Sequence, residues 1–79
     1  MKIRLADIFE DTEKAVITLW HVAENDRVAG GQDLLEIATD KATFDIAAPC
    51  NGILASIMKK EGEEITADEV IAELIEDGS

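Results

Sequence analysis

Lys41 is the residue of this 79-residue chain best placed for chemistry, because it follows Asp40 between two short apolar runs. These runs, residues 34–39 and 42–47, are predicted strands, and a two-residue connection between strands forms a tight hairpin turn. A lysine at such a turn is exposed, and its deprotonated amine can form an amide with an activated acyl group. The spacing therefore offers a site for covalent modification, although most lysines at turns are solubilising charge.

The other reactive side chains form no catalytic arrangement. His21, the single histidine, alternates with Trp20 and Val22 in a strand-like run, which favours a surface or structural role. Cys50 is the single cysteine, so an intrachain disulfide and a thiolate metal cluster are excluded. Beside Pro49 it is interpreted as a turn or packing residue. The 18 carboxylates show no metal-site spacing, so we predict a non-catalytic domain without a metal.

Length and charge restrict the function classes. The chain is long enough for one small domain, residues 1–79, with one hydrophobic core. Its net charge of −11 argues against nucleic acid and anionic membranes as partners. No signal peptide or membrane-spanning run is visible. We expect a soluble monomer in the cytoplasm, or in the mitochondrial matrix of a eukaryote, and a piece of a longer chain would look the same.

Two segments repeat each other with a shift of 37 residues, 17–40 and 54–77. Few of the matched positions are identical, but the spacing of apolar and acidic residues is kept. The matched pairs are Trp20 with Ile57, Glu24 with Glu61, Val28 with Ile65, Leu34 with Ile71, Glu36 with Glu73, Ile37 with Leu74, and Asp40 with Asp77. Gly78 matches Lys41, so the repeated fold does not require a lysine there. A duplicated architecture with pseudo-twofold symmetry is the simplest interpretation.

Local patterns predict strands throughout. Long strands are expected at 14–22, 34–39, 42–47, 52–59 and 70–76. Turn signals fall at 24–26, 30–31, 49–52 and 61–63. Short strands with regularly spaced turns indicate an all-β sandwich or flattened barrel.

A helix is the alternative for residues 63–76, which contain good helix formers and a capping-box spacing from Thr66 to Glu69. The matching segment 26–40 contains two adjacent glycines, which are poor residues for a helix interior. We therefore predict strand for both segments.

The hairpin register can be derived from its loop. If Asp40 and Lys41 are the two loop residues, the numbers of paired residues sum to 81. The apolar pairs are then Ile37 with Phe44 and Leu35 with Ile46, and the opposite face pairs Ala38 with Thr43 and Glu36 with Asp45. A slip of one residue would scatter the apolar set over both faces. The predicted core residues are Leu19, Ile37, Phe44, Ile46, Leu54, Ile57, Ile65, Ile71 and Leu74, with Trp20 at the edge.

The stretch Thr39-Asp40-Lys41-Ala42, followed by DIAAP at 45–49, resembles the attachment loop of lipoyl domains of 2-oxo acid dehydrogenase complexes. The resemblance covers nearly the whole chain and includes WHVAENDRV at 20–28 and EGEEI at 61–65. It implies two four-stranded antiparallel sheets. It also implies lipoate in amide linkage to Lys41, with Asp40 and Ala42 as flanking recognition residues.

Two positions depart from the family pattern. Ala38 stands three residues before the lysine, where glutamate is frequent, on the face that a modifying ligase would read. Asn25 replaces a usual turn glycine, and asparagine tolerates the left-handed backbone that such a turn needs.

By this resemblance the domain is a swinging arm, not an enzyme, and could belong to an acyltransferase chain. The implied partners are a lipoyl ligase or lipoyltransferase, a thiamine-dependent 2-oxo acid decarboxylase, an acyltransferase and dihydrolipoamide dehydrogenase. The acidic stretch 7–13 would lie near Lys41 and could help the decarboxylase select the domain, with Phe9 as its one aromatic residue. The alternative for this stretch is a solvated turn without a partner.

Two other functions stay open. Biotinyl carrier domains of carboxylases share the fold, but they flank their lysine with methionines, whereas Asp40 and Ala42 flank Lys41 here. The third interpretation is an acidic interaction domain that carries no prosthetic group.

Overall fold

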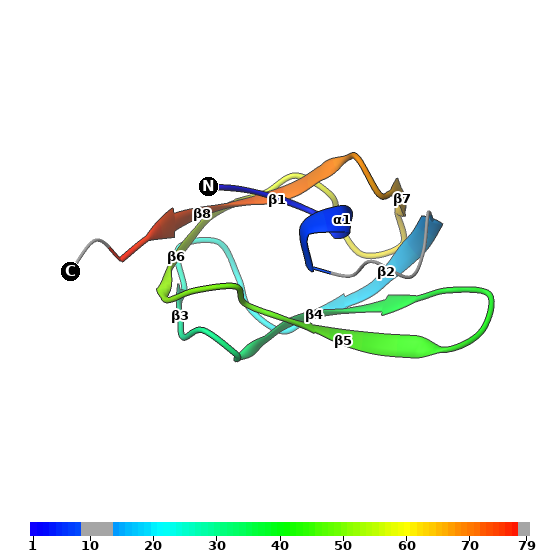
Figure 1. The fold of residues 1–79 in the computed structure, drawn as a ribbon, viewed down its shortest axis with the longest axis horizontal. Helices are drawn as coiled ribbons and strands as arrows, with labels where there is room; N and C mark the ends of the chain where they lie inside the picture. The colour runs from blue at the N-terminus through cyan, green and yellow to red at the C-terminus, as the bar shows by residue number, and fades with distance from the viewer. Residues whose placement is uncertain (9–13, 78–79) are drawn as a thin grey trace.

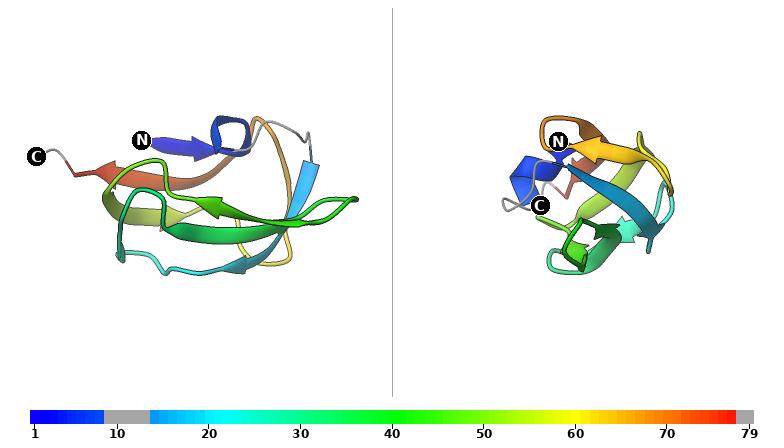
Figure 2. Two further views of the ribbon diagram at one scale, coloured as in Figure 1. Left: turned by 60° about the horizontal axis from the view of Figure 1, so that its bottom comes forward. Right: turned by 90° about the vertical axis from the view of Figure 1, so that its right-hand side faces the viewer.

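The computed structural model describes residues 1–8 and 14–77, which form two facing antiparallel sheets (Figures 1 and 2). One sheet has the strand order β1-β8-β6-β3 and the other β5-β4-β2-β7. The elements are β1 (Lys2–Arg4), α1 (Leu5–Ile8), β2 (Lys14–Trp20), β3 (Arg27–Val28), β4 (Asp33–Ala38), β5 (Thr43–Ala47), β6 (Gly52–Ile57), β7 (Glu64–Thr66) and β8 (Val70–Glu76). The predicted fold of two four-stranded antiparallel sheets is confirmed.

The predicted duplication appears as an exchange of equivalent strands. A shift of 37 residues places β2, β3 and β4 on β6, β7 and β8. With β5 in the role of β1, the two sheet orders become the same. Even the irregularities match, because β2 has a bulge between Ile17 and Leu19 and β6 has one between Leu54 and Ser56. Each sheet combines strands of both halves, so the halves cannot separate without breaking strand pairs.

Two carboxylates join the halves in a symmetric way. Glu24 Oε2 accepts the backbone N–H of Ile57 at 2.7 Å, and Glu61 Oε2 accepts the backbone N–H of Trp20 at 2.9 Å. These are two of the pairs that the sequence repeat matched. Charge-assisted bonds of this kind are stronger than neutral ones. The matched acidic residues Glu24 and Glu61 therefore serve the fold.

The turns before β3 and β7 both need a left-handed residue. Asn25 has φ of 74° and its equivalent, Gly62, has φ of 88°. The expectation that Asn25 keeps the geometry of a glycine is confirmed. Asparagine is among the few non-glycine residues that adopt this conformation readily.

Substitutions at Asn25 should separate backbone strain from side-chain contacts. Asn25→Ala is expected to lower the free energy of unfolding by about 1 kcal/mol, because alanine is strained at positive φ, whereas Asn25→Gly should be neutral or slightly stabilising. Urea denaturation of the two variants measures the difference. Gly62→Ala is the matched control and should cost a similar amount. Equal stability of the Ala and Gly variants would show that the turn is not strained.

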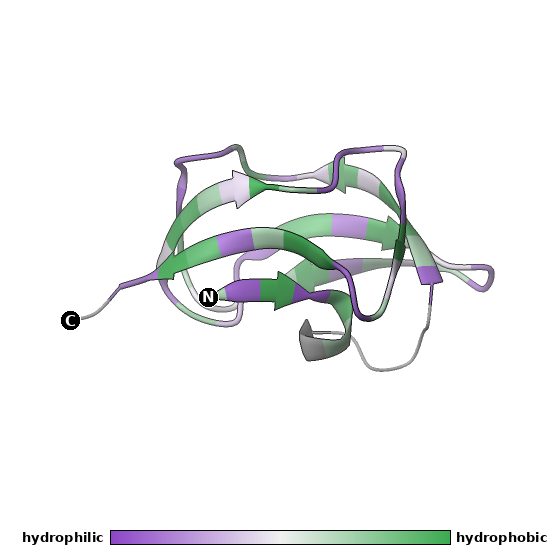
Figure 3. Ribbon diagram, turned by 90° about the horizontal axis from the view of Figure 1, so that it is seen from above, coloured by the Kyte–Doolittle hydropathy of each residue, from purple (hydrophilic) through white to green (hydrophobic). Residues whose placement is uncertain are grey.

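The core lies between the sheets, and apolar and polar residues alternate along the strands (Figure 3). Six predicted core residues are buried: Ile37, Ile46, Leu54, Ile65, Ile71 and Leu74. Ile57 and Trp20 are partly buried and pack against the core. The predictions for Leu19 and Phe44 are wrong, since they are 44% and 37% exposed. The bulge in β2 turns Leu19 outward, and Phe44 lies on the edge strand β5, where Ile46 is the one buried residue.

Residues 63–76 are strands, as predicted, and the capping-box residues close a turn between β7 and β8 instead. The backbone N–H of Thr66 donates to Glu69 Oε1 at 2.9 Å, and the backbone N–H of Glu69 donates to the Thr66 carbonyl at 3.2 Å. Lys59 Nζ lies 2.9 Å from Glu69 Oε2. This hydrogen bond lowers the pKa of Glu69 and raises the pKa of Lys59. A helix-start signal thus serves a β-turn here.

The N-terminal segment adds elements that the sequence patterns did not predict. β1 pairs with β8, and α1 follows it directly. Ile3 and Leu5 are fully buried in the core. The described part of the chain contains no helix of the length and apolarity needed to cross a membrane. Residues 9–13, which hold most of the acidic stretch and Phe9, lie outside the described residues, so their predicted role is untested.

Candidate functional site

The hairpin of β4 and β5 has the register derived from the sequence. Its pairs are Leu35 with Ile46, Glu36 with Asp45, Ile37 with Phe44, and Ala38 with Thr43. The loop contains only residues 39–42, with Asp40 and Lys41 at its tip. Figure 1 shows this loop projecting beyond the two sheets at the end of the molecule remote from the C-terminus.

Lys41 has the accessibility that a modification site needs. The residue is exposed, and within the described ranges its side chain makes no hydrogen bond or ion pair. Lys59, by contrast, is engaged with Glu69. Flanking Asp40 and Ala42 are exposed as well. Position 78, the sequence equivalent of Lys41, lies outside the described residues.

Thr39 organises the turn, a role that sequence reasoning missed although the residue belongs to the quoted motif. Its hydroxyl accepts the backbone N–H groups of Lys41 at 3.3 Å and Ala42 at 3.4 Å, and donates to the Ala42 carbonyl at 3.2 Å. The Thr39 N–H also donates to the Ala42 carbonyl, at 2.8 Å. The presence of threonine two residues before the lysine could have predicted this role, because Ser and Thr side chains often form hydrogen bonds with backbone groups in turns.

Removing the Thr39 hydroxyl should loosen the tip of the hairpin. Thr39→Val keeps the shape and is expected to cost about 1 kcal/mol of unfolding free energy. The amides of Lys41 and Ala42 should exchange with solvent deuterium faster in this variant, because they lose their acceptor. Thr39→Ser, which keeps the hydroxyl, should exchange at the wild-type rate. Unchanged exchange in Thr39→Val, followed by NMR, would exclude this role.

The two strands below the tip are anchored in the core, and their paired carboxylates are hydrogen-bonded. Leu35, Ile37 and Ile46 are buried in the core. Each carboxylate of the like-charged pair Glu36 and Asp45 has its own hydrogen-bond partner. Thr18 Oγ1 donates to Glu36 Oε2 at 2.7 Å, and His21 Nε2 lies 3.2 Å from Asp45 Oδ1. His21, which follows β2, is thus an exposed residue with a structural contact to the hairpin, in line with the sequence interpretation.

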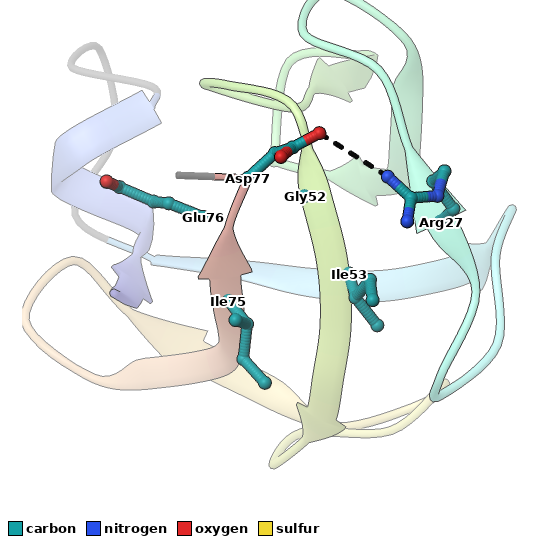
Figure 4. A pocket seen from close by; sticks show the side chains of 6 residues that line it. All are labelled: Arg27, Gly52, Ile53, Ile75, Glu76 and Asp77. Atoms are coloured by element: carbon teal, nitrogen blue, oxygen red, sulfur yellow. Dashed lines mark hydrogen bonds and ion pairs between the residues drawn. The ribbon is translucent and has the colours of Figure 1, made fainter. Parts of the chain in front are cut away.

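The remaining candidates lie apart from the tip. Cys50 is partly buried and packs against the core, consistent with its predicted packing role. A pocket lies at the opposite end of the domain (Figure 4), lined by Arg27, Gly52, Ile53, Ile75, Glu76 and Asp77. Among the described residues, no His, Cys, Asp and Glu side chains gather into a group able to hold a metal ion. The hairpin tip, where Lys41 is exposed, remains the candidate site.

Comparison with known proteins agrees with this geometry. The family model of the biotin/lipoyl domains, described as biotin-requiring enzyme, matches residues 1–74. The chain belongs to this biotin/lipoyl family. Within it, the solved structure of the lipoyl domain of the 2-oxoglutarate dehydrogenase complex from Azotobacter vinelandii is similar, with a TM-score of 0.79 and 26% identity. The similarity covers 99% of our chain and 99% of the Azotobacter chain, so the two domains share the same fold.

Curated relatives place the chain on the lipoyl side of the biotin/lipoyl family. It is 37% identical over 79 residues to the dihydrolipoyllysine-residue succinyltransferase component of the 2-oxoglutarate dehydrogenase complex of Rickettsia conorii. It is 32% identical over 78 residues to the acetyltransferase component of the pyruvate dehydrogenase complex of Acholeplasma laidlawii. The matches cover 100% and 99% of this lipoyl domain but only 20% and 14% of those relatives. The comparisons thus support a lipoyl carrier over the biotinyl alternative.

Proposed function

We propose that this lipoyl domain holds lipoate in amide linkage to Lys41 Nζ and presents it to the active sites of a 2-oxo acid dehydrogenase complex. The observation that supports this most is the position of Lys41. It is exposed at the tip of the loop 39–42, on a hairpin that Leu35, Ile37 and Ile46 anchor in the core. An exposed lysine amine at the tip of a hairpin anchored in the core is suited to the attachment of a carboxylic acid through an amide bond.

The chain contributes position and access to the chemistry, and we assign catalysis to partner enzymes. Bound lipoate supplies a dithiolane that accepts acyl groups and electrons. The Thr39 hydroxyl keeps the turn closed at the base of the arm. Asp40 and Ala42, which flank the lysine, are exposed beside it. A carrier on a tethered domain also raises the effective concentration of its cargo at each active site.

The partners follow from this role. A lipoyl ligase or lipoyltransferase would attach the group to Lys41. A thiamine-dependent decarboxylase, an acyltransferase and dihydrolipoamide dehydrogenase would then use it in turn. The names of the relatives, which are acyltransferase components, support membership in such a complex.

Enzymatic modification in vitro tests the proposal. The unmodified domain is incubated with lipoyl ligase, ATP and lipoate, and in parallel with biotin ligase, ATP and biotin. Intact mass should rise by one lipoyl group in the first reaction and stay unchanged in the second. A mass increase only with biotin would support the biotinyl alternative. No increase in either reaction would favour an interaction domain without a prosthetic group.

A further inference from the structure

The outer face of the β5-β4-β2-β7 sheet has exposed apolar side chains beside the hairpin. Val16 is 36% exposed and Leu19 is 44% exposed. Val16 stands opposite Ala38 on β4 and opposite Glu64 on β7, so these three share one face. We call Val16, Leu19, Ala38 and Glu64 the hairpin flank. An isolated exposed aliphatic residue needs no explanation, but two on one small face next to the candidate site indicate a contact surface.

The charge around the hairpin flank is predominantly negative. Glu36, Asp45 and Glu64 lie on this outer face, with Lys14 at its edge on β2. The outer face of the other sheet differs, since its charges balance. There Lys2 stands opposite Glu73, and Arg27 Nη1 lies 3.4 Å from Asp77 Oδ2. The acidic character of the hairpin flank complements a basic partner surface, which would accelerate and orient encounter.

The hairpin flank is also the surface nearest to Lys41 along β4. Ala38 is the last residue of β4 before the loop 39–42 that carries Lys41. An enzyme that modifies the bare lysine can reach Nζ only within the length of one side chain. Such an enzyme must therefore cover the surface that surrounds the tip. An enzyme that uses a longer, modified arm has no such constraint.

We infer that the hairpin flank is the docking surface for the enzyme that attaches the acyl group to Lys41. The enzyme would place an apolar side chain against Val16 and Leu19 and surround it with lysines or arginines that face Glu64 and its neighbours. This inference rests on the proposed function, because it names the partner of the same site.

Matched apolar substitutions test the contact. Leu19→Ser and its control Ile75→Ser each replace an exposed aliphatic residue, but Ile75, 57% exposed, lies on the other sheet. Lipoyl ligase is assayed at saturating ATP and lipoate with varied concentrations of unmodified domain. We expect kcat/KM to fall roughly five- to tenfold for Leu19→Ser, mainly through KM, and to stay unchanged for Ile75→Ser. Val16→Ser, on the same face, should act like Leu19→Ser and serves if that variant does not fold.

Matched charge substitutions test the electrostatic part. Glu64→Gln should lower kcat/KM about threefold at low salt, and the difference should vanish at high salt because exposed charges are then screened. Glu76→Gln, at the end of β8 on the other sheet, should have no effect. Thermal unfolding of every variant confirms that the substrates are folded at the assay temperature.

The outcomes separate this inference from the proposed function. If wild type is modified on Lys41 and the flank variants react at the same rate as wild type or their controls, the docking inference is wrong and the proposed function stands. If wild type is not modified at all, the proposed function fails and the inference fails with it. A concentration-dependent dimer that Leu19→Ser abolishes would assign the hairpin flank to self-association and overturn the inference too.

Discussion

Replacing Lys41 by arginine is expected to abolish attachment of lipoate completely. The guanidinium group stays protonated under all ordinary conditions, so it cannot attack an activated acyl group, although its charge and length resemble those of lysine. Lys41 lies at an exposed tip, and its side chain makes no hydrogen bond or ion pair with the described residues. We therefore expect the free energy of unfolding to change by less than about 0.5 kcal/mol. Loss of function would then be a chemical effect and not a folding defect.

Intact mass after incubation with ligase, ATP and lipoate measures this prediction. Lys60→Arg is the control, because Lys60 is also exposed but lies in the loop between β6 and β7. That variant should accept one lipoyl group as wild type does. A lipoyl group on Lys41→Arg would place the attachment site on another lysine and refute the assignment.

Gly52→Ala is expected to lower the free energy of unfolding more than alanine at Gly31 or Gly62. A Cβ atom at Gly52 would stand 2.2 Å from the Ile75 carbonyl oxygen and 3.0 Å from the Ile75 carbonyl carbon. Both are backbone atoms of the neighbouring strand, where Gly52 pairs with Glu76. The pairing of β6 with β8 must therefore open locally. We expect a loss of about 3 kcal/mol, a large share of the total stability of a small domain.

Gly31→Ala is the matched control for this effect. Nothing lies within 4 Å of a Cβ at Gly31, but its φ of 88° strains an alanine. The expected cost is about 1 kcal/mol, from the backbone alone. Urea denaturation of both variants compares the two costs. If Gly52→Ala is no less stable than Gly31→Ala, the close approach of β6 and β8 is not as tight as described.

Local pattern and internal symmetry account for most of what the sequence predicted. The hairpin register followed from a loop of two residues and the period-two alternation of apolar side chains, and it holds at Leu35, Ile37 and Ala38. Glu24 and Glu61 are matched in the sequence repeat, and in the structure each accepts a hydrogen bond from the backbone of the other half. Because the two halves have the same pattern and form equivalent strands, the pattern of one half supported the strand prediction for the other.

The errors come from features that depend on neighbouring strands. Leu19 was predicted to be buried because a regular strand alternates, whereas a bulge of one residue reverses its side. Phe44 pairs with buried Ile37, but it lies on the edge strand β5 and is 37% exposed. β1 has three residues, too few for a periodic pattern, so its pairing with β8 could not be derived. The role of the Thr39 hydroxyl required the closed geometry of the turn.

The attachment site is tested most directly by peptide mapping of the protein purified from its native source. Proteolysis followed by mass spectrometry should show one lipoyl group on the peptide that contains Lys41, with fragment ions that place it on that residue. The other lysines of the chain should be unmodified. An unmodified Lys41, a biotinyl group on it, or lipoate on a different lysine would contradict the account.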